Sequence, residues 1–211
     1  YQFKRINDAV ILKEELKQFC LFNKIRGTTI IAKEGINGTL AGLKDSINIF
    51  ISLMINKGFA NLELKYSYYK FMPFNRLKIK FKKEIVTFRS KYLDPEHKTG
   101  KHINVNNWNT LIKNKDTLVI DVRNDFEFKL GTFQGAINPH TKNFTEFKKY
   151  VDQELTNYKK RRIAMFCTGG IRCEKASSYM ISQGFEDVNQ LKGGILKYLK
   201  NMLKNHSIWK G

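Results

Sequence analysis

Cysteine and histidine are scarce in this chain of 211 residues. It has three cysteines, Cys20, Cys167 and Cys173, and four histidines. An odd and sparse set of cysteines is not a disulfide framework, and it indicates a reducing compartment. The spacing of Cys167 and Cys173 does not match a CxxC metal or redox motif, and the histidines form no ligand pattern. We therefore expect no metal held by the protein.

Long apolar runs are also missing. No stretch approaches the roughly 18 to 20 uninterrupted apolar residues that a membrane span needs, and no secretory signal pattern opens the chain. We therefore expect a cytoplasmic protein without a membrane segment. The first residue is Tyr1 rather than methionine, so we expect the natural start to lie upstream. With 42% hydrophobic and 27% charged residues, the composition is that of a folded protein with one large or two small domains.

Acidic residues are few relative to basic ones. The chain has 38 Lys and Arg against 19 Asp and Glu, and both halves are basic, with 17 against 7 in residues 1–90 and 21 against 12 in residues 91–211. This charge indicates a polyanionic partner, for which nucleic acid is the usual candidate. Lysine supplies 30 of the 38 cations, so a nucleotide-composition bias of the genome is an alternative source of the charge.

Residues 1–90 predict a ferredoxin-like α+β domain. Apolar residues at helical spacing predict helices over 9–23, where Cys20 falls on the core-facing stripe, and over 45–56. Apolar or β-branched runs predict strands over 1–6, 26–33, 39–42, 62–66 and 77–88. The sequence EGING at 34–38 predicts a hairpin turn at Asn37-Gly38. The order β-α-β-β-α-β is typical of the ferredoxin-like arrangement.

Residues 108–211 predict an α/β domain with a parallel sheet. Before them, residues 91–107 are polar and lack periodicity, which predicts a linker. Strands are expected over 117–122, 135–138, 162–166 and 187–191, and helices over 144–155, 172–183 and 195–204. Strands that alternate with helices form parallel sheets, whose ligand sites lie beyond the carboxyl ends of the strands. Cys167 follows one such end.

The segment from Cys167 to Arg172, CTGGIR, predicts a reactive-thiol loop. Gly169 and Gly170 permit positive φ, so that the backbone N–H groups around Thr168 to Ile171 can point inward at an anion. The following helix adds its free N-terminal amides and the positive end of its dipole. Together with the charge of Arg172, these features favour a thiolate at Cys167. An inert strand cysteine before a plain turn is the alternative, but the coincidence of strand, Cys, Gly-Gly, Arg and helix favours the reactive site. The C-x4-R span is one residue shorter than the C-x5-R loop of cysteine phosphatases, and it suits a sulfur or small adduct better than a phosphate.

Several longer strings carry a family resemblance. CTGGIR, with DVR at 121–123 and GTFQGAIN at 131–138, resembles a rhodanese domain. The strings CTGGIRCEKAS (167–177), IAKEGINGTLAG (31–42) and DVRNDFEFKLGTFQGAINP (121–139) resemble the rhodanese-domain tRNA uridine hydroxylases. Members of that family commonly continue past a W-x-G segment, whereas this sequence ends at Trp209-Lys210-Gly211, so a further segment is expected in the natural protein.

The resemblance implies a fold and a reaction. The fold is an acylphosphatase-like (ferredoxin-like) domain followed by a rhodanese domain, and the essential cysteine is Cys167. The reaction is oxidation of the wobble uridine in the tRNA anticodon loop to 5-hydroxyuridine, with molecular oxygen as co-substrate. The residues themselves indicate no cofactor.

Other residues near the loop have two interpretations each. Cys173 either resolves an oxidised or persulfidated Cys167 or packs beneath the loop. Asp121 and Arg123 are expected to brace the loop by ion pairs rather than to do chemistry. Four aromatic residues mixed with Lys65 and Lys70 either stack bases of a single-stranded loop or belong to the core; they are Tyr66, Tyr68, Tyr69 and Phe71.

Two further functions remain open at this point. A rhodanese-type sulfurtransferase would carry a persulfide on Cys167 and would use the same loop equally well. A non-enzymatic RNA-binding module would not need the complete loop from Cys167 to Arg172, which argues against it.

Overall fold

The computed structural model describes residues 1–91 and 93–211. They form two compact units, Tyr1–Val86 and Thr87–Gly211, each with a core of its own. Among the described residues, no helix combines the length and the apolarity that a membrane crossing requires.

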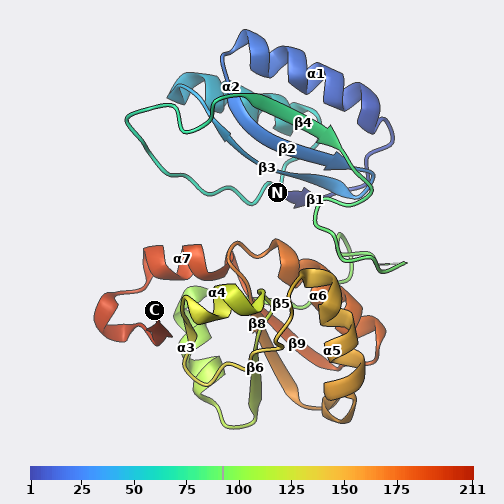
Figure 1. The fold of residues 1–211 in the computed structure, drawn as a ribbon, viewed down its shortest axis with the longest axis vertical. Helices are drawn as coiled ribbons and strands as arrows, with labels where there is room; N and C mark the ends of the chain where they lie inside the picture. Colours follow the sequence, from blue (N-terminus) through green and yellow to red (C-terminus); the bar gives the residue numbers. More distant parts are fainter. Residues whose placement is uncertain (92) are drawn as a thin grey trace. The chain divides into compact units, whose positions relative to one another are not determined.

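The first unit is a four-stranded sheet with two helices against one face (Figure 1). Its elements follow the predicted order: β1 (Gln2–Phe3), α1 (Ala9–Phe22), β2 (Arg26–Ala32), β3 (Gly35–Ala41), α2 (Lys44–Asn56) and β4 (Leu77–Phe81). The strand order is β1-β3-β2-β4, in which β1 and β2 are antiparallel to β3 and β4 is parallel to β2. The core gathers Leu16 and Cys20 of α1, Ile31 of β2 and Met54 of α2, all fully buried. The prediction that Cys20 packs in the core is confirmed.

Three predictions for the first unit are wrong. The hairpin turn lies at Lys33–Glu34 rather than at Asn37-Gly38, because β2 and β3 pair continuously from Arg26↔Ala41 to Ala32↔Gly35. Asn37 is therefore a strand residue, and its amide donates to the Ile85 carbonyl at 3.2 Å. Residues 62–66 form no strand, and the strand predicted over 77–88 ends at Phe81. The alternating apolar residues in 62–66 predict a strand, but this segment pairs with no strand of the sheet.

The second unit is built on a parallel sheet with strand order β5-β9-β8-β6. Its strands are β5 (Lys101–Ile103), β6 (Thr117–Asp121), β8 (Arg162–Phe166) and β9 (Asp187–Leu191). Its helices are α3 (Val105–Lys113), α4 (Asp125–Lys129), α5 (Phe147–Glu154), α6 (Ile171–Ser182) and α7 (Gly194–Asn201). A separate antiparallel pair joins β7 (Thr132–Phe133) to β10 (Trp209–Lys210).

Several boundaries in this unit differ from expectation: α3 begins inside the predicted linker, and no helix was expected at α4. β5, at residues 101–103, falls inside the predicted linker, yet it pairs with β9 and forms an edge of the sheet. A three-residue polar strand has no periodicity that a sequence analysis can detect. The strand expected over 135–138 is reduced to a single bridge between Ile137 and Ile120, while the regular pairing occurs at β7.

The core of the second unit is aromatic. Phe133 is fully buried and lies edge-on to four other rings, with centroid distances of 5.7 Å to Trp108, 4.8 Å to Phe166, 4.7 Å to Tyr198 and 5.3 Å to Trp209. Edge-to-face pairs of this kind add to the free energy gained by burying the rings. The cluster fixes Phe166, the last residue of β8, and hence the starting point of the loop that follows.

Candidate active site

The loop from Cys167 to Gly170 joins the carboxyl end of β8 to α6 (Figure 1). Cys167 is fully buried, and Gly170 takes a φ of +100°, a conformation that favours glycine. This turn directs the Gly170 N–H at the Cys167 Sγ, 3.1 Å away. Of the loop amides that the sequence predicts to point at the thiol, the Gly170 N–H makes this contact, at the expected strand end.

The surroundings of Cys167 favour its charged form. Burial raises the pKa of the thiol, but this effect is outweighed by hydrogen bonds from the Cys173 thiol and from the backbone N–H groups of Cys173 and Gly170, and by the charge of Arg172. The pKa of Cys167 falls to about 6 as a result. Burial and the neighbouring Cys167 raise the pKa of Cys173 well above its ordinary value, so Cys173 stays a thiol that can donate.

Arg172 is held by a carboxylate that the sequence analysis missed. Its two terminal nitrogens donate to the two oxygens of Glu127 at 2.6 and 2.7 Å, and one of them also donates to the Thr168 hydroxyl at 3.1 Å. Glu127 further accepts from the Thr168 hydroxyl and from the Asn124 N–H, each at 3.1 Å. Bidentate pairing fixes the plane of the guanidinium as well as its distance. The spacing Asn124-x-x-Glu127 indicates a helix start, but nothing in it indicates the partner across the site.

The amino end of α7 holds the outer side of the loop. The N–H groups of Ile195 and Leu196 donate to the carbonyls of Cys167 and Thr168 at 3.0 and 3.1 Å. These amides have no partner within the helix, so the loop satisfies them. The contact is close enough that a Cβ on Gly194, whose φ is +66°, would lie 2.5 Å from the Cys167 carbonyl oxygen.

Asp121 and Arg123 were expected to brace the loop by ion pairs, but their side chains pair with each other instead. Arg123 donates to both oxygens of Asp121, at 2.9 and 2.7 Å, and to the Gly131 carbonyl at 2.5 Å, and its guanidinium lies 5.3 Å from the ring centre of Trp209. The buried pair therefore fastens the turn before β7 and the β10 strand. The following residue, Val122, donates its N–H to the Phe166 carbonyl at 2.9 Å, which links this segment to the base of the loop.

A buried polar network lies on the other side of Cys173. Glu174, in the first turn of α6, accepts from Thr99 and Gln190 at 2.9 Å each and pairs with His102 at 2.9 Å. Burial raises the pKa of Glu174, but the paired His102 and the other donors outweigh it and lower the pKa overall. The network ties the edge strand β5 to the helix that carries Cys173.

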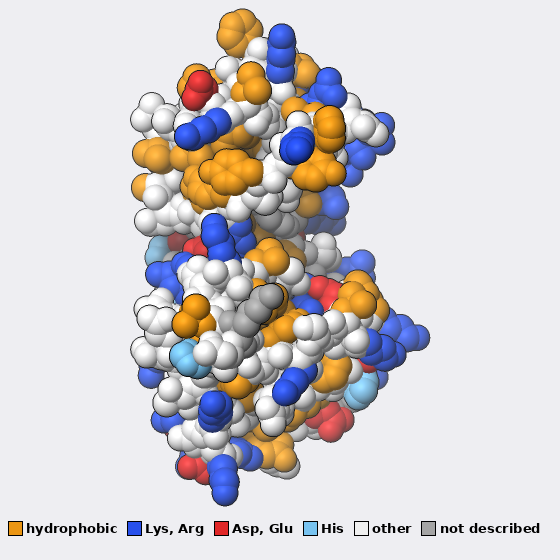
Figure 2. Space-filling view, turned by 90° about the vertical axis from the view of Figure 1, so that its left-hand side faces the viewer, with side chains coloured by type: hydrophobic (Ala, Val, Ile, Leu, Met, Phe, Trp, Pro, Cys, Tyr) orange, Lys and Arg blue, Asp and Glu red, His pale blue; other side chains and the backbone are white. Residues whose placement is uncertain are grey.

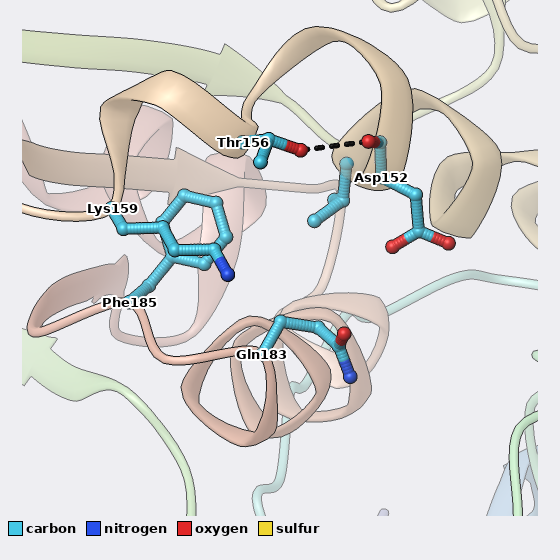
Figure 3. A pocket seen from close by; sticks show the side chains of 6 residues that line it. Asp152, Thr156, Lys159, Gln183 and Phe185 are labelled. Atoms are coloured by element: carbon cyan, nitrogen blue, oxygen red, sulfur yellow. Dashed lines mark hydrogen bonds between the residues drawn. The ribbon is translucent and has the colours of Figure 1, made fainter.

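One hollow of the second unit lies away from the cysteine loop. The hollow in Figure 3, with a volume of about 180 Å³, lies between α5 and the carboxyl end of α6, where Gln183 and Lys159 face Asp152. The Thr156 hydroxyl donates to the Asp152 carbonyl there at 2.7 Å. α6 separates this hollow from the cysteine loop by roughly 18 Å along its axis. Within the described part of the chain, no three His, Cys, Asp or Glu side chains are grouped so as to hold a metal ion.

Comparison with known families matches both units. Residues 1–85 match the model of the UPF0176 acylphosphatase-like domain, and residues 106–201 match the rhodanese-like domain. The chain is thus a two-domain protein with an acylphosphatase-like domain followed by a rhodanese domain, and the predicted fold class is confirmed.

Curated relatives cover the whole chain. Proteins named tRNA uridine(34) hydroxylase from Nitrobacter winogradskyi, Nitrobacter hamburgensis and Bradyrhizobium diazoefficiens are each 47% identical to it over 216 aligned residues, which span 100% of this chain and 85% of each relative. The chain belongs to the family of the tRNA uridine(34) hydroxylases.

The charge of Cys167 can be followed by the ultraviolet absorbance of the thiolate. We expect the difference between wild type and Cys167→Ser to titrate with a pKa of about 6. Cys173→Ala and Arg172→Gln each remove a group that stabilises the thiolate, so each raises this pKa. Cys173→Ser keeps a donor and serves as the matched control. A wild-type titration near the value of a free cysteine, about 8.5, contradicts the electrostatic account.

Acid conditions test the pairing of Glu127. Burial raises the pKa of this carboxyl, but the hydrogen bonds and charge of Arg172 outweigh it and bring the pKa down to about 2, from 4.5 in the unfolded chain. Because the folded pKa is the lower one, the stabilisation is fully present above about pH 5 and is lost as the pH falls toward 2. We expect Glu127→Gln to lower the free energy of unfolding by about 1 to 3 kcal/mol at neutral pH, since solvent screens part of the pairing, and by progressively less in acid, in urea unfolding. Asp116→Asn, at an exposed carboxylate, is the control, and a deficit independent of pH contradicts the prediction.

Close packing of α7 on the loop predicts a large effect of Gly194→Ala. The new methyl meets backbone atoms of Cys167, Thr168 and Gly170, which cannot move aside without displacing the loop. We expect a loss of about 3 kcal/mol or more in unfolding free energy and a higher Cys167 pKa. Gly135→Ala is the control, because its φ of +80° carries similar backbone strain but its Cβ meets nothing within 4 Å. Equal effects of the two substitutions would refute the packing argument.

Proposed function

We propose that this chain hydroxylates uridine 34 of tRNA to 5-hydroxyuridine, with molecular oxygen as co-substrate and the Cys167 thiolate as the reactive group. The observation that carries the proposal is full-length similarity, at 47% identity, to proteins named tRNA uridine(34) hydroxylase. A cysteine with a pKa of about 6, at the carboxyl end of a parallel strand, supports it independently.

The substrate supplies the reason for the charge. Uridine 34 is the wobble base, so we propose that the anticodon loop is the part of the tRNA that binds. Lys and Arg side chains are spread over the face shown in Figure 2, and they suit a phosphate backbone. An unpaired loop base can turn out of its stack toward a reactive group at little cost. We further propose that the enzyme works in the cytoplasm, where its tRNA substrate is found.

The reaction replaces the C5–H bond of uracil by C5–OH. With dioxygen as oxidant, one oxygen atom enters the base and the other leaves as water; we propose that two thiols supply the two electrons and two protons and become a disulfide. The thiolate adds to C6 of uracil and breaks the C5–C6 double bond, so that C5 becomes the electron-rich carbon that takes the oxygen, and loss of the C5 proton and of the thiolate then restores the double bond. We assign this role to Cys167 and assign to Cys173 the hydrogen bond that keeps its partner charged. Because Cys167 has no exposed surface, we propose that the loop opens before the base reaches its sulfur.

Nucleoside mass spectrometry of cellular tRNA tests the proposal. We expect 5-hydroxyuridine to disappear from cells that lack the gene and from cells that carry Cys167→Ser. It should persist in cells with Cys20→Ser, which alters a core cysteine of the first unit. The purified protein should form the nucleoside in air and not under nitrogen.

An unchanged 5-hydroxyuridine level in all strains would contradict this function. If thiosulfate-to-cyanide sulfur transfer that depends on Cys167 were found as well, the loop would be assigned to persulfide chemistry instead.

A further inference from the structure

The segment between α2 and β4 exposes an unusual number of aromatic side chains. Residues 64–73 are ten consecutive exposed residues without helix or strand, drawn in Figure 1 as the long loop that leads into β4. The exposed fractions are 85% for Tyr68, 77% for Tyr69, 74% for Phe71 and 50% for Tyr66. We call these four residues the aromatic strip.

Core packing does not explain the strip. As a strand, the segment would have turned alternate residues toward the sheet, but it forms no strand and buries none of the four rings. Within the strip, Tyr69 and Phe71 contact each other edge-on, with ring centroids 6.2 Å apart at 71°. Exposed apolar residues gathered in one segment mark an interaction surface more often than single exposed residues do.

The charge around the strip indicates what it binds. Residues 62–83 contain seven Lys and Arg and one acidic residue, Glu63. Lys65 pairs with that Glu63 at 3.6 Å, whereas Lys70 and Arg76 are exposed beside the rings in the sequence. Figure 2 shows hydrophobic side chains with Lys and Arg among them over the first unit. Exposed rings with interspersed cations are the combination that binds single-stranded nucleic acid, because the rings stack on bases and the cations meet phosphates.

We propose that the aromatic strip is a stacking surface for unpaired nucleotides of the tRNA, with Lys70 and Arg76 at the adjacent phosphates. The proposal rests on the function proposed above, since it takes tRNA as the substrate. It assigns RNA contact to the acylphosphatase-like unit, apart from the cysteine loop. Stacking on exposed rings is tolerant of base identity, so the strip strengthens binding of an open loop without selecting uridine.

Binding of two RNA probes to the full-length chain tests the strip. The probes are an anticodon stem-loop with uridine 34 and a fully paired duplex of equal length, measured by fluorescence anisotropy over a range of salt concentrations. We expect Tyr68→Ala, and the pair Tyr69→Ala with Phe71→Ala, to weaken stem-loop binding about 5- to 100-fold while duplex binding changes little. Tyr68→Phe keeps the ring and should bind as wild type does. Phe22→Ala is the matched control, because Phe22 is an 87% exposed ring in α1 of the same unit.

Salt dependence separates the two kinds of contact. Lys70→Gln and Arg76→Gln should each reduce the slope of log affinity against log salt by about one, whereas the ring substitutions should leave it unchanged. Ring variants that bind the stem-loop as tightly as wild type would overturn the proposal. So would a large loss of thermal stability in those variants, which would mean that the rings pack against protein.

The outcomes also distinguish this proposal from the proposed function. A wild-type chain that binds neither probe would remove the tRNA substrate and both proposals with it. If the wild type and the ring variants bind the stem-loop equally well, only the proposal for the strip fails, and the proposed function stands.

Discussion

The interaction on which the second unit's site depends is that between the buried Cys167 sulfur and the groups that stabilise its negative charge. A buried anion is costly unless donors and a cation compensate it, and here the compensation comes from Gly170, Cys173 and Arg172. Arg172 is itself a largely buried charge, with 16% of its side chain exposed, and the bidentate pair with Glu127 compensates it. The loop is thus a short chain of alternating charges whose members constrain one another, and removing one changes the state of the rest.

Local sequence patterns predicted much of the fold. β8 has the bounds expected from 162–166, because its buried residues 163–166 are a continuous apolar run, as is typical of parallel strands. β9 also has its expected bounds, 187–191, although it carries Asn189 and Gln190. The predictions went wrong where pairing depends on distant residues. The Asn37-Gly38 dipeptide has turn chemistry, yet seven cross-strand pairs hold it within β3. β5 is recognisable only through its partner β9, which follows it by more than 80 residues.

The residues of the candidate site also divide into those that a local pattern predicted and those that depend on distant contacts. Cys167, Gly170 and Arg172 lie within six residues of one another, so the sequence alone predicts a reactive thiol there. Glu127 is 45 positions from Arg172 in the sequence, and Gly194 contacts the loop from another helix. No spacing rule could have linked either residue to the loop. For Asp121 and Arg123, the sequence predicted the position but not the contacts. Their position after a strand placed them near the loop, but their side chains close on each other and on Gly131 instead.

The amides of Ile195 and Leu196 that hold the loop carbonyls give the site an order of assembly. Translation runs from the amino end, so the ribosome makes the nucleophile and its arginine well before it makes the helix that fixes their backbone. Once residues up to Leu191 have been made, the sheet can pair, and Gly170, Arg172 and Cys173 are already in the chain. The two carbonyls at the start of the loop gain their donors only when α7 has formed, so the hold on the loop backbone is completed last.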